Sequence, residues 1–171
     1  MSKIKYSLIF CFVFLIAYSN FVGVNATETE IDTSLFKYIE NEDDTLTIYR
    51  YDGTDETVVF PSEIDGKKVS CVGNGSSYVL SSSNTKTVLI SEGIIKLEYA
   101  FCECMELVTV SLPSTLKIIG DRTFDSCYNL SNIILPEGLT SIGYAAFHEC
   151  SSIEKLVVPD SVTYIGELAF F

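Results

Sequence analysis

The chain has 171 residues, of which 47% are hydrophobic and 20% are charged, a composition typical of folded proteins and outside the range of disordered chains. It carries 23 Asp and Glu residues against 11 Lys and Arg residues, for a net charge of −12. This acidity argues against nucleic-acid binding, which needs a basic footprint, and against an anionic membrane surface. A cationic protein partner is compatible with the charge, although acidic residues also serve simply to keep a secreted protein in solution.

The first 26 residues have the three-part form of a secretory signal peptide. Residues 1–5 are short and basic, residues 6–24 are mostly apolar, and Val24-Asn25-Ala26 places small residues where a signal peptidase cleaves. We therefore expect cleavage after Ala26 and a mature protein that is secreted or held at the cell surface, without stable membrane insertion. The alternative is an uncleaved anchor, since an apolar run of this length can span a bilayer.

Two further segments precede the main part of the chain. Residues 27–35 are polar and are predicted to form a flexible leader. In residues 36–57, aromatic and branched residues alternate on both sides of an acidic turn at residues 40–44, which predicts a β-hairpin that caps the first coil of the repeats. The acidic turn is also open to interpretation as a calcium loop, but it lacks the alternating oxygen ligands and central glycine of such loops.

From residue 58 to residue 171, the sequence repeats with a period of 23 residues. Self-similarity at such a period predicts a solenoid, in which each unit buries its apolar face only against its neighbours. The first unit is degenerate, with an insertion at residues 65–68 and a stretch rich in Gly, Ser and Asn at residues 73–85 in place of the usual Phe and Cys. The recurring positions are Phe101, Phe124, Phe147 and Phe170, then Cys104, Cys127 and Cys150, and then Pro113, Pro136 and Pro159.

The last three units contain a Leu-x-x-Ile-x-Leu step, or a close variant, followed by proline, as in residues 130–136. This step predicts a short strand whose second and third apolar residues point inward and which ends at the proline. Farther along, the pair Ile142-Gly143 permits a tight turn or a positive φ. The unit at residues 88–110 is one residue short and has Leu97-Glu98 instead, so we expect a different turn there.

These units closely resemble the BspA-like class of leucine-rich repeats over roughly residues 58–171. Residues 45–73, with the step Phe-Pro-Ser-Glu-Ile-Asp-Gly-Lys-Lys-Val, also resemble the region that precedes the repeats in bacterial members. The resemblance implies a repeat solenoid that is rich in short parallel strands, joined by short helical or 3-10 turns and capped by an N-terminal β-hairpin. Known members are secreted or surface proteins implicated in adhesion and in binding host or matrix proteins, which implies binding and no reaction.

The last unit stops at Phe171, before the position where another strand would begin. We therefore expect an uncapped C-terminal end of the solenoid. An open apolar coil predicts fraying, self-association, or a chain that is a fragment of a longer protein.

The residues with catalytic or metal-binding potential are few. Cys104 and its repeats occupy one inward site in successive coils, where parallel side chains do not suit a disulfide, so we expect buried reduced thiols. Cys102-x-Cys104 lacks the second ligand pair of a zinc site. His148, the only histidine, has no recognisable nucleophile partner and is interpreted as a surface residue. We assign no catalytic, cofactor-binding or metal-binding residues and expect no enzyme activity.

A candidate binding strip lies between the inward positions of the expected strands, whose intervening residues face the open side. The strip mixes small polar groups, one lysine and apolar side chains, which suits a protein or glycan partner; the alternative is that these are merely tolerated strand residues. Its residues are Thr87, Leu89, Thr109, Ser111, Asn132, Ile134, Lys155 and Val157.

Three classes of function follow from these observations. The main hypothesis is a secreted, noncatalytic module for adhesion or binding at a cell surface or host interface. The second is a structural spacer, or a truncated piece of a larger surface protein, with no ligand of its own. The third, a hydrolase or metal protein, needs clustered polar residues that the repeat register does not bring together.

Overall fold

The computed structural model describes residues 4–5, 30–76, 78–80 and 84–171 of the chain, which forms two compact units, residues 1–34 and 35–171. In the first unit, β1 (Ile4–Lys5) pairs antiparallel with β2 (Glu30–Ile31). The predicted signal peptide otherwise lies outside the described residues, and cleavage after Ala26 stays a prediction. The described part of the expected leader contains β2 and a 3-10 turn, η3 (Thr33–Leu35), which spans the boundary between the units.

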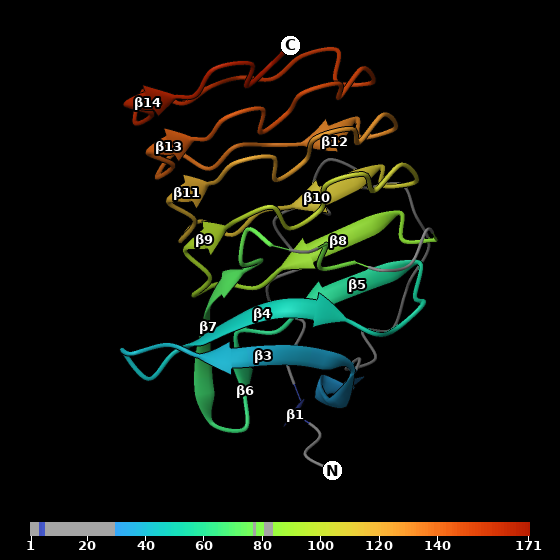
Figure 1. Cartoon of the computed structure of the whole chain (residues 1–171), viewed down its shortest axis with the longest axis vertical. Helices are drawn as coiled ribbons and strands as arrows, with labels where there is room; N and C mark the ends of the chain where they lie inside the picture. The colour runs from blue at the N-terminus through green and yellow to red at the C-terminus, as the bar shows by residue number, and fades with distance from the viewer. Residues whose placement is uncertain (1–3, 6–29, 77, 81–83) are drawn as a thin grey trace, which may run out of the picture. The chain divides into compact units, whose positions relative to one another are not determined.

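The second unit confirms the predicted solenoid of short parallel strands. Each inner coil adds one strand to each of two parallel ladders, which Figure 1 shows as two stacks of arrows. The first ladder consists of β5 (Thr57–Phe60), β8 (Thr87–Ile90), β10 (Thr109–Ser111) and β12 (Asn132–Ile133). The second consists of β4 (Leu46–Tyr51), β7 (Lys67–Val72), β9 (Lys96–Leu97), β11 (Ile118–Ile119), β13 (Ser141–Ile142) and β14 (Tyr164–Ile165), with β3 at its edge.

The sequence predicted only the first of these ladders. The Leu-x-x-Ile-x-Leu step forms β10 and β12, whereas the Ile-Gly pairs, which were expected to form turns, end the short strands of the second ladder. In both ladders the register matches the sequence repeat: Val110 lies opposite Val88 and Ile133, and Ile119 lies opposite Leu97. A repeated sequence position therefore becomes a column of like side chains along the solenoid.

The hairpin expected at the start of the second unit is present. β3 (Phe36–Glu40) pairs antiparallel with β4 across the acidic turn and forms the edge of the second ladder. Lys67 Nζ contacts Glu40 Oε2 at 2.9 Å and Asp44 Oδ1 at 2.7 Å, so a lysine partly neutralises this turn. The insertion at residues 65–68 forms a second hairpin, in which β6 (Glu63–Ile64) pairs with β7.

A stack of phenylalanine rings forms the centre of the core. The ring centroids of Phe101 and Phe124 are 5.6 Å apart, and those of Phe124 and Phe147 are 5.2 Å apart, with both pairs stacked. Phe60 from β5 meets Phe101 edge-on, with ring centroids 5.6 Å apart, and Phe36 of the hairpin meets Phe60 edge-on at 5.5 Å. The degenerate first unit lacks a phenylalanine at the repeat position, and Phe60 of its strand β5 supplies the aromatic contact to Phe101.

The glycine of each Ile-Gly pair is required by close packing and not by its own φ. Positive φ occurs two residues later, at 50° for Ala145 and 58° for Leu168, which corrects the expectation at Gly143. A Cβ atom on Gly143 would lie only 2.6 Å from the main-chain nitrogen of Asp121 and from the carbonyl carbon of Gly120. Successive coils therefore approach so closely at this corner that no side chain fits between them.

The short unit keeps most of this corner despite its Leu97-Glu98 pair. The main-chain nitrogen of Glu98 donates to Val72 O at 2.9 Å, as that of Gly143 donates to Ile119 O at 2.8 Å. Tyr99 also has the positive φ of the corner, at 55°. The expected difference thus consists of one missing residue and of the Glu98 side chain, which stands where the other coils have glycine and pairs with Lys96 Nζ at 2.8 Å.

Candidate functional site

The outward face of the first ladder contains six of the eight residues of the predicted binding strip. Thr109 lies opposite Thr87 on one side and Asn132 on the other, and Ser111 lies opposite Leu89. These side chains are half-exposed or exposed, and the side chain of Ile134, which follows β12, is 66% exposed. The intervening inward residues are buried, so this face has the alternation that the sequence predicted.

Strand β5 extends the same face by two residues that the sequence analysis missed. Thr57 lies opposite Thr87, and Val59 lies opposite Leu89. Thr57 is exposed and Val59 is half-exposed. The match between Thr-Val-Val-Phe at residues 57–60 and Thr-Val-Leu-Ile at residues 87–90 is the signal that identifies them.

The last coil does not continue the ladder as expected. Residues 153–158 form no strand, although they repeat the sequence pattern of β12, and the first ladder ends at β12. Lys155 and Val157 are both exposed, and Val157 is 67% exposed. The prediction that these two residues lie on a strand is wrong, because this coil packs against a neighbouring coil on one side only and its apolar residues are not enclosed.

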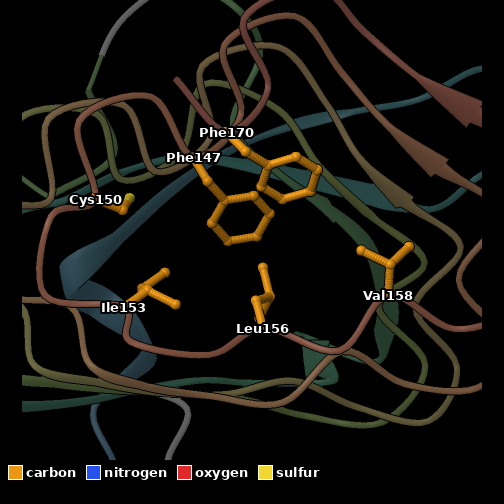
Figure 2. Close-up of a pocket in the computed structure, with 6 residues that line it drawn as sticks. All are labelled: Phe147, Cys150, Ile153, Leu156, Val158 and Phe170. Carbon is orange, nitrogen blue, oxygen red and sulfur yellow. The ribbon is translucent and has the colours of Figure 1, made fainter.

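An apolar pocket of about 290 Å³ opens in this last coil. Figure 2 shows the rings of Phe147 and Phe170 side by side, facing Leu156 and flanked by Ile153 and Val158. The counterparts of these positions one repeat earlier are buried in the core. The pocket, which Cys150 completes, therefore has the chemistry of a core position and offers no charged group to a ligand.

The thiols of the repeated cysteines lie along the core, as predicted. Cys127 Sγ donates to Phe101 O at 3.1 Å, and Cys150 Sγ donates to Phe124 O at 3.0 Å. All five cysteines among the described residues are free. Burial raises the pKa of Cys104 and that of Cys150 to about 12, and it raises the pKa of Cys127 as well. These thiols stay protonated at neutral pH and are poor nucleophiles.

A carboxylate lies beside His148, contrary to the sequence analysis. The 23-residue register brings Asp125 Oδ1 to 2.9 Å from His148 Nδ1, and both side chains are mostly buried. Cys102 occupies the equivalent position one coil earlier, and burial together with the charge of Asp125 raises its pKa to about 11. The carboxylate thus lies between the thiol and the imidazole, an order in which the imidazole cannot take the proton of the thiol.

In residues 4–5, 30–76, 78–80 and 84–171, no group of three or more His, Cys, Asp and Glu side chains is placed to hold a metal ion. Within the same ranges, no helix is long and apolar enough to cross a membrane.

Comparison with known proteins identifies relatives of this solenoid. The chain is 33% identical to the leucine-rich repeat protein of T. pallidum (TpLRR), with a TM-score of 0.75 over 83% of this chain and 66% of that one. It is 25% identical to a leucine-rich repeat protein from Bacteroides ovatus, with a TM-score of 0.65 over 84% of this chain and 38% of that one. For a leucine-rich cell surface protein from Faecalibacterium prausnitzii, the identity is 27% and the TM-score is 0.60, over 84% and 46% of the two chains.

The chain therefore spans less than two thirds of the length of each of these relatives. No curated protein matches its sequence. The family model of the BspA type leucine rich repeat region matches residues 74–171, in six copies. Leucine-rich repeats of this kind typically bind proteins and are generally noncatalytic. Because this match covers more than half of the sequence and the coils stack in its register, the chain belongs to the BspA-type leucine-rich repeat family.

Proposed function

We propose that the chain is a secreted, noncatalytic module that binds a protein, or a glycan, at a cell surface or host interface. The observation that carries the proposal is the outward face of the first ladder, where side chains from four strands form two rows in register. The description of the Faecalibacterium relative as a cell surface protein supports the location. The predicted signal peptide supports secretion.

The chemistry of the strip suits a protein partner. Thr57, Thr87 and Thr109 supply hydroxyl groups, while Val59, Leu89 and Ile134 supply partly or fully exposed apolar surface beside them. Branched side chains have few rotamers, so little conformational entropy is lost when a partner covers them. The net charge of −12 would steer a cationic partner toward the module, while the strip itself makes the contacts.

The test compares two exposed isoleucines on opposite ladders. Ile134 lies at the strip, and Ile95, which is 48% exposed, precedes β9 of the second ladder. Ile134→Asp is expected to weaken binding of the full chain to a panel of immobilised matrix proteins and glycans by at least about tenfold, or ~1.4 kcal/mol, while Ile95→Asp leaves it unchanged. Equal binding by the two variants, or a loss confined to Ile95→Asp, would reject the strip.

The exposed end of the last coil favours a second candidate, a structural segment that associates end to end and has no ligand of its own. The side chain of Phe170 is 46% exposed and that of Phe171 is 80% exposed, beside the apolar pocket. Apolar patches of this kind mark association surfaces. Sedimentation of the full chain should then show concentration-dependent self-association that Phe171→Ser reduces and Ile95→Asp does not. A monomer at all concentrations would remove self-association from the proposal.

A further inference from the structure

The corner that follows β7 contains the only Asn-Gly step of the sequence, at Asn74-Gly75. Asn74, Gly75 and Ser76 are all exposed, and Gly75 has a φ of 74°. Gly75 has no side chain to shield its main-chain nitrogen, and the described residues provide no hydrogen-bond acceptor for that N–H. The nitrogen of Gly75 is therefore accessible as a nucleophile.

The side chain of Asn74 is held in a conformation that favours attack by this nitrogen. The main-chain N–H of Ser76 donates to Asn74 Oδ1 at 3.0 Å, which forms an Asx turn. The ring closed by this hydrogen bond contains both Asn74 Cγ and the nitrogen of Gly75, so the turn keeps the electrophile and the nucleophile near each other. The same N–H faces the oxygen on which negative charge develops when Cγ is attacked, and it stabilises that charge.

We propose that Asn74 is a site of spontaneous deamidation in the folded protein. The nitrogen of Gly75 loses its proton and attacks Asn74 Cγ, and an N–C bond forms. The C–N bond of the side-chain amide then breaks, and ammonia leaves with the proton. Water opens the resulting five-membered succinimide at either carbonyl group and yields aspartate or isoaspartate, with one new negative charge and no change in oxidation state.

Two other asparagines, Asn129 and Asn41, lack this arrangement. Asn129 Nδ2 donates to Met105 O at 2.8 Å, and the following nitrogen, of the buried Leu130, donates to Cys127 O at 3.0 Å. The side chain of Asn41 forms hydrogen bonds with Thr45 and Thr47. These two asparagines provide internal controls within the same molecule.

The new carboxylate would form at a crowded junction between two coils. A Cβ atom on Gly75 would lie 3.7 Å from Glu98 Cγ, and Glu98 Oε2 is paired with Lys96 Nζ at 2.8 Å. A side chain on the adjacent Gly73 would overlap the main-chain oxygen of Glu98. Deamidation therefore adds a negative charge at this corner, and the isoaspartate product lengthens the main chain next to Gly73, where a side chain does not fit.

The experiment follows each asparagine in the purified full chain by peptide mapping and mass spectrometry during incubation at increasing pH. Conversion of Asn74 is expected with release of ammonia, and at a rate that rises with pH because the nitrogen must lose its proton, while Asn41 and Asn129 stay intact. Asn74→Gln, which cannot form the five-membered ring, should release no ammonia from this corner. Gly75→Ala should slow conversion at least about tenfold, corresponding to ~1.4 kcal/mol in the barrier.

A second measurement keeps the result decisive if Gly75→Ala disturbs the fold at its positive φ. The same incubation is carried out on the wild-type chain in denaturant. Conversion in the folded chain at least as fast as in the unfolded chain supports the proposal. If Asn74 persists in the folded chain while it converts in denaturant, or if Asn129 converts equally fast in the folded chain, the proposed role of the corner is wrong.

Discussion

Two coils with the same sequence pattern differ sharply in structure. In residues 130–135, the apolar positions of the Leu-x-x-Ile-x-Leu step are buried and β12 forms. In residues 153–158, the same positions are half-exposed or exposed and no strand forms. Likewise Phe124 is fully buried, whereas the side chain of Phe170 is 46% exposed. The local sequence is nearly equivalent, so the difference comes from packing: the inner coil has a neighbour on both sides and the last coil has a neighbour on one.

For the first ladder, the comparison indicates that strand formation depends on stacking more than on local propensity, whereas β14 of the second ladder forms in the last coil with β13 as its one partner. Stability in such arrays is approximately a sum of small intrinsic terms and larger interfaces between neighbours. A coil with two interfaces therefore gains about twice the burial of a coil with one. Substitutions at equivalent positions of the two coils measure this difference directly.

The largest expected contrast is between Phe124→Ala and Phe170→Ala. Removal of the ring of Phe124, which stacks on Phe101 and Phe147, should lower the free energy of unfolding by about 3–5 kcal/mol. Phe170 stacks on Phe147 alone, so its truncation should cost less than half as much. Urea denaturation followed by circular dichroism measures both values. Equal losses would mean that stacking on both sides does not determine the stability of a coil.

The second contrast concerns two glycines of one coil, Gly143 and Gly138. Gly143→Ala places a methyl group against the main chain of the preceding coil, which cannot move without disturbing the ladder, and should cost about 1–3 kcal/mol. A Cβ atom on Gly138 would meet Lys117 Nζ at 2.7 Å, and a flexible side chain can move aside. Gly138→Ala should therefore change the free energy of unfolding by only about 0.5 kcal/mol or less. A similar loss in both variants would contradict a special role for the corner.

These contrasts also explain what the sequence could predict. The 23-residue period predicted the solenoid, the first ladder and the ring stack. A residue type that recurs at this spacing forms a column of equivalent side chains when the coils stack. The second ladder was missed because two-residue strands such as Ser141–Ile142 are too short to show alternation. The contact of Phe60 with Phe101 was missed because Phe60 lies at the strand position of Ile90 and not at the position of the repeated phenylalanines. The pairing of Asp125 with His148 arises only when coils stack.

At neutral pH a smaller effect is expected from the thiols. Cys127 is buried between coils, while Cys150 lines the pocket of the last coil, so an alkylating reagent should modify Cys150 first. Modification should nevertheless be slow, because burial keeps the folded pKa of Cys150 near 12 against an unfolded value of 9.0. Mass spectrometry of partially alkylated protein gives the order, and preferential modification of Cys127 would contradict the packing of the two coils.

The same raised pKa values set the sign of a pH effect on stability. Because the folded thiol holds its proton more tightly than the unfolded thiol, its contribution is fully present below about pH 9 and is lost as the pH rises toward about 12. The free energy of unfolding should fall over this window. Cys127→Ala should make the fall less steep, and an unchanged slope in this variant would show that the buried thiol does not contribute.

The smallest expected effect concerns a corner that recurs in the inner coils. Glu149 has a φ of 57°, and the equivalent corner residues Glu103 and Ser126 have 59° and 61°. The left-handed conformation costs a residue with a side chain about 1–2 kcal/mol, while glycine loses about 0.5–1 kcal/mol of backbone entropy on folding. Both Glu149→Gly and Glu149→Ala lose the hydrogen bond from Tyr128 OH to Glu149 Oε2 at 2.9 Å, so Glu149→Gly should be more stable than Glu149→Ala by up to about 1 kcal/mol. Glu137→Gly, exposed and without positive φ, should instead be less stable than Glu137→Ala by a similar amount.

Thermal denaturation of these glycine and alanine variants separates turn geometry from stacking. At a different corner, the one that follows each Ile-Gly pair, Leu168 is the counterpart of Ala145 and keeps a φ of 58° in the last coil, so that corner forms without neighbours on both sides. If Glu149→Gly is less stable than Glu149→Ala, the positive φ is not a local strain and must be maintained by packing. A Glu149→Gly variant that is the more stable of the two would instead mean that corners are determined within each coil, and that the strands of the first ladder depend on adjacent coils.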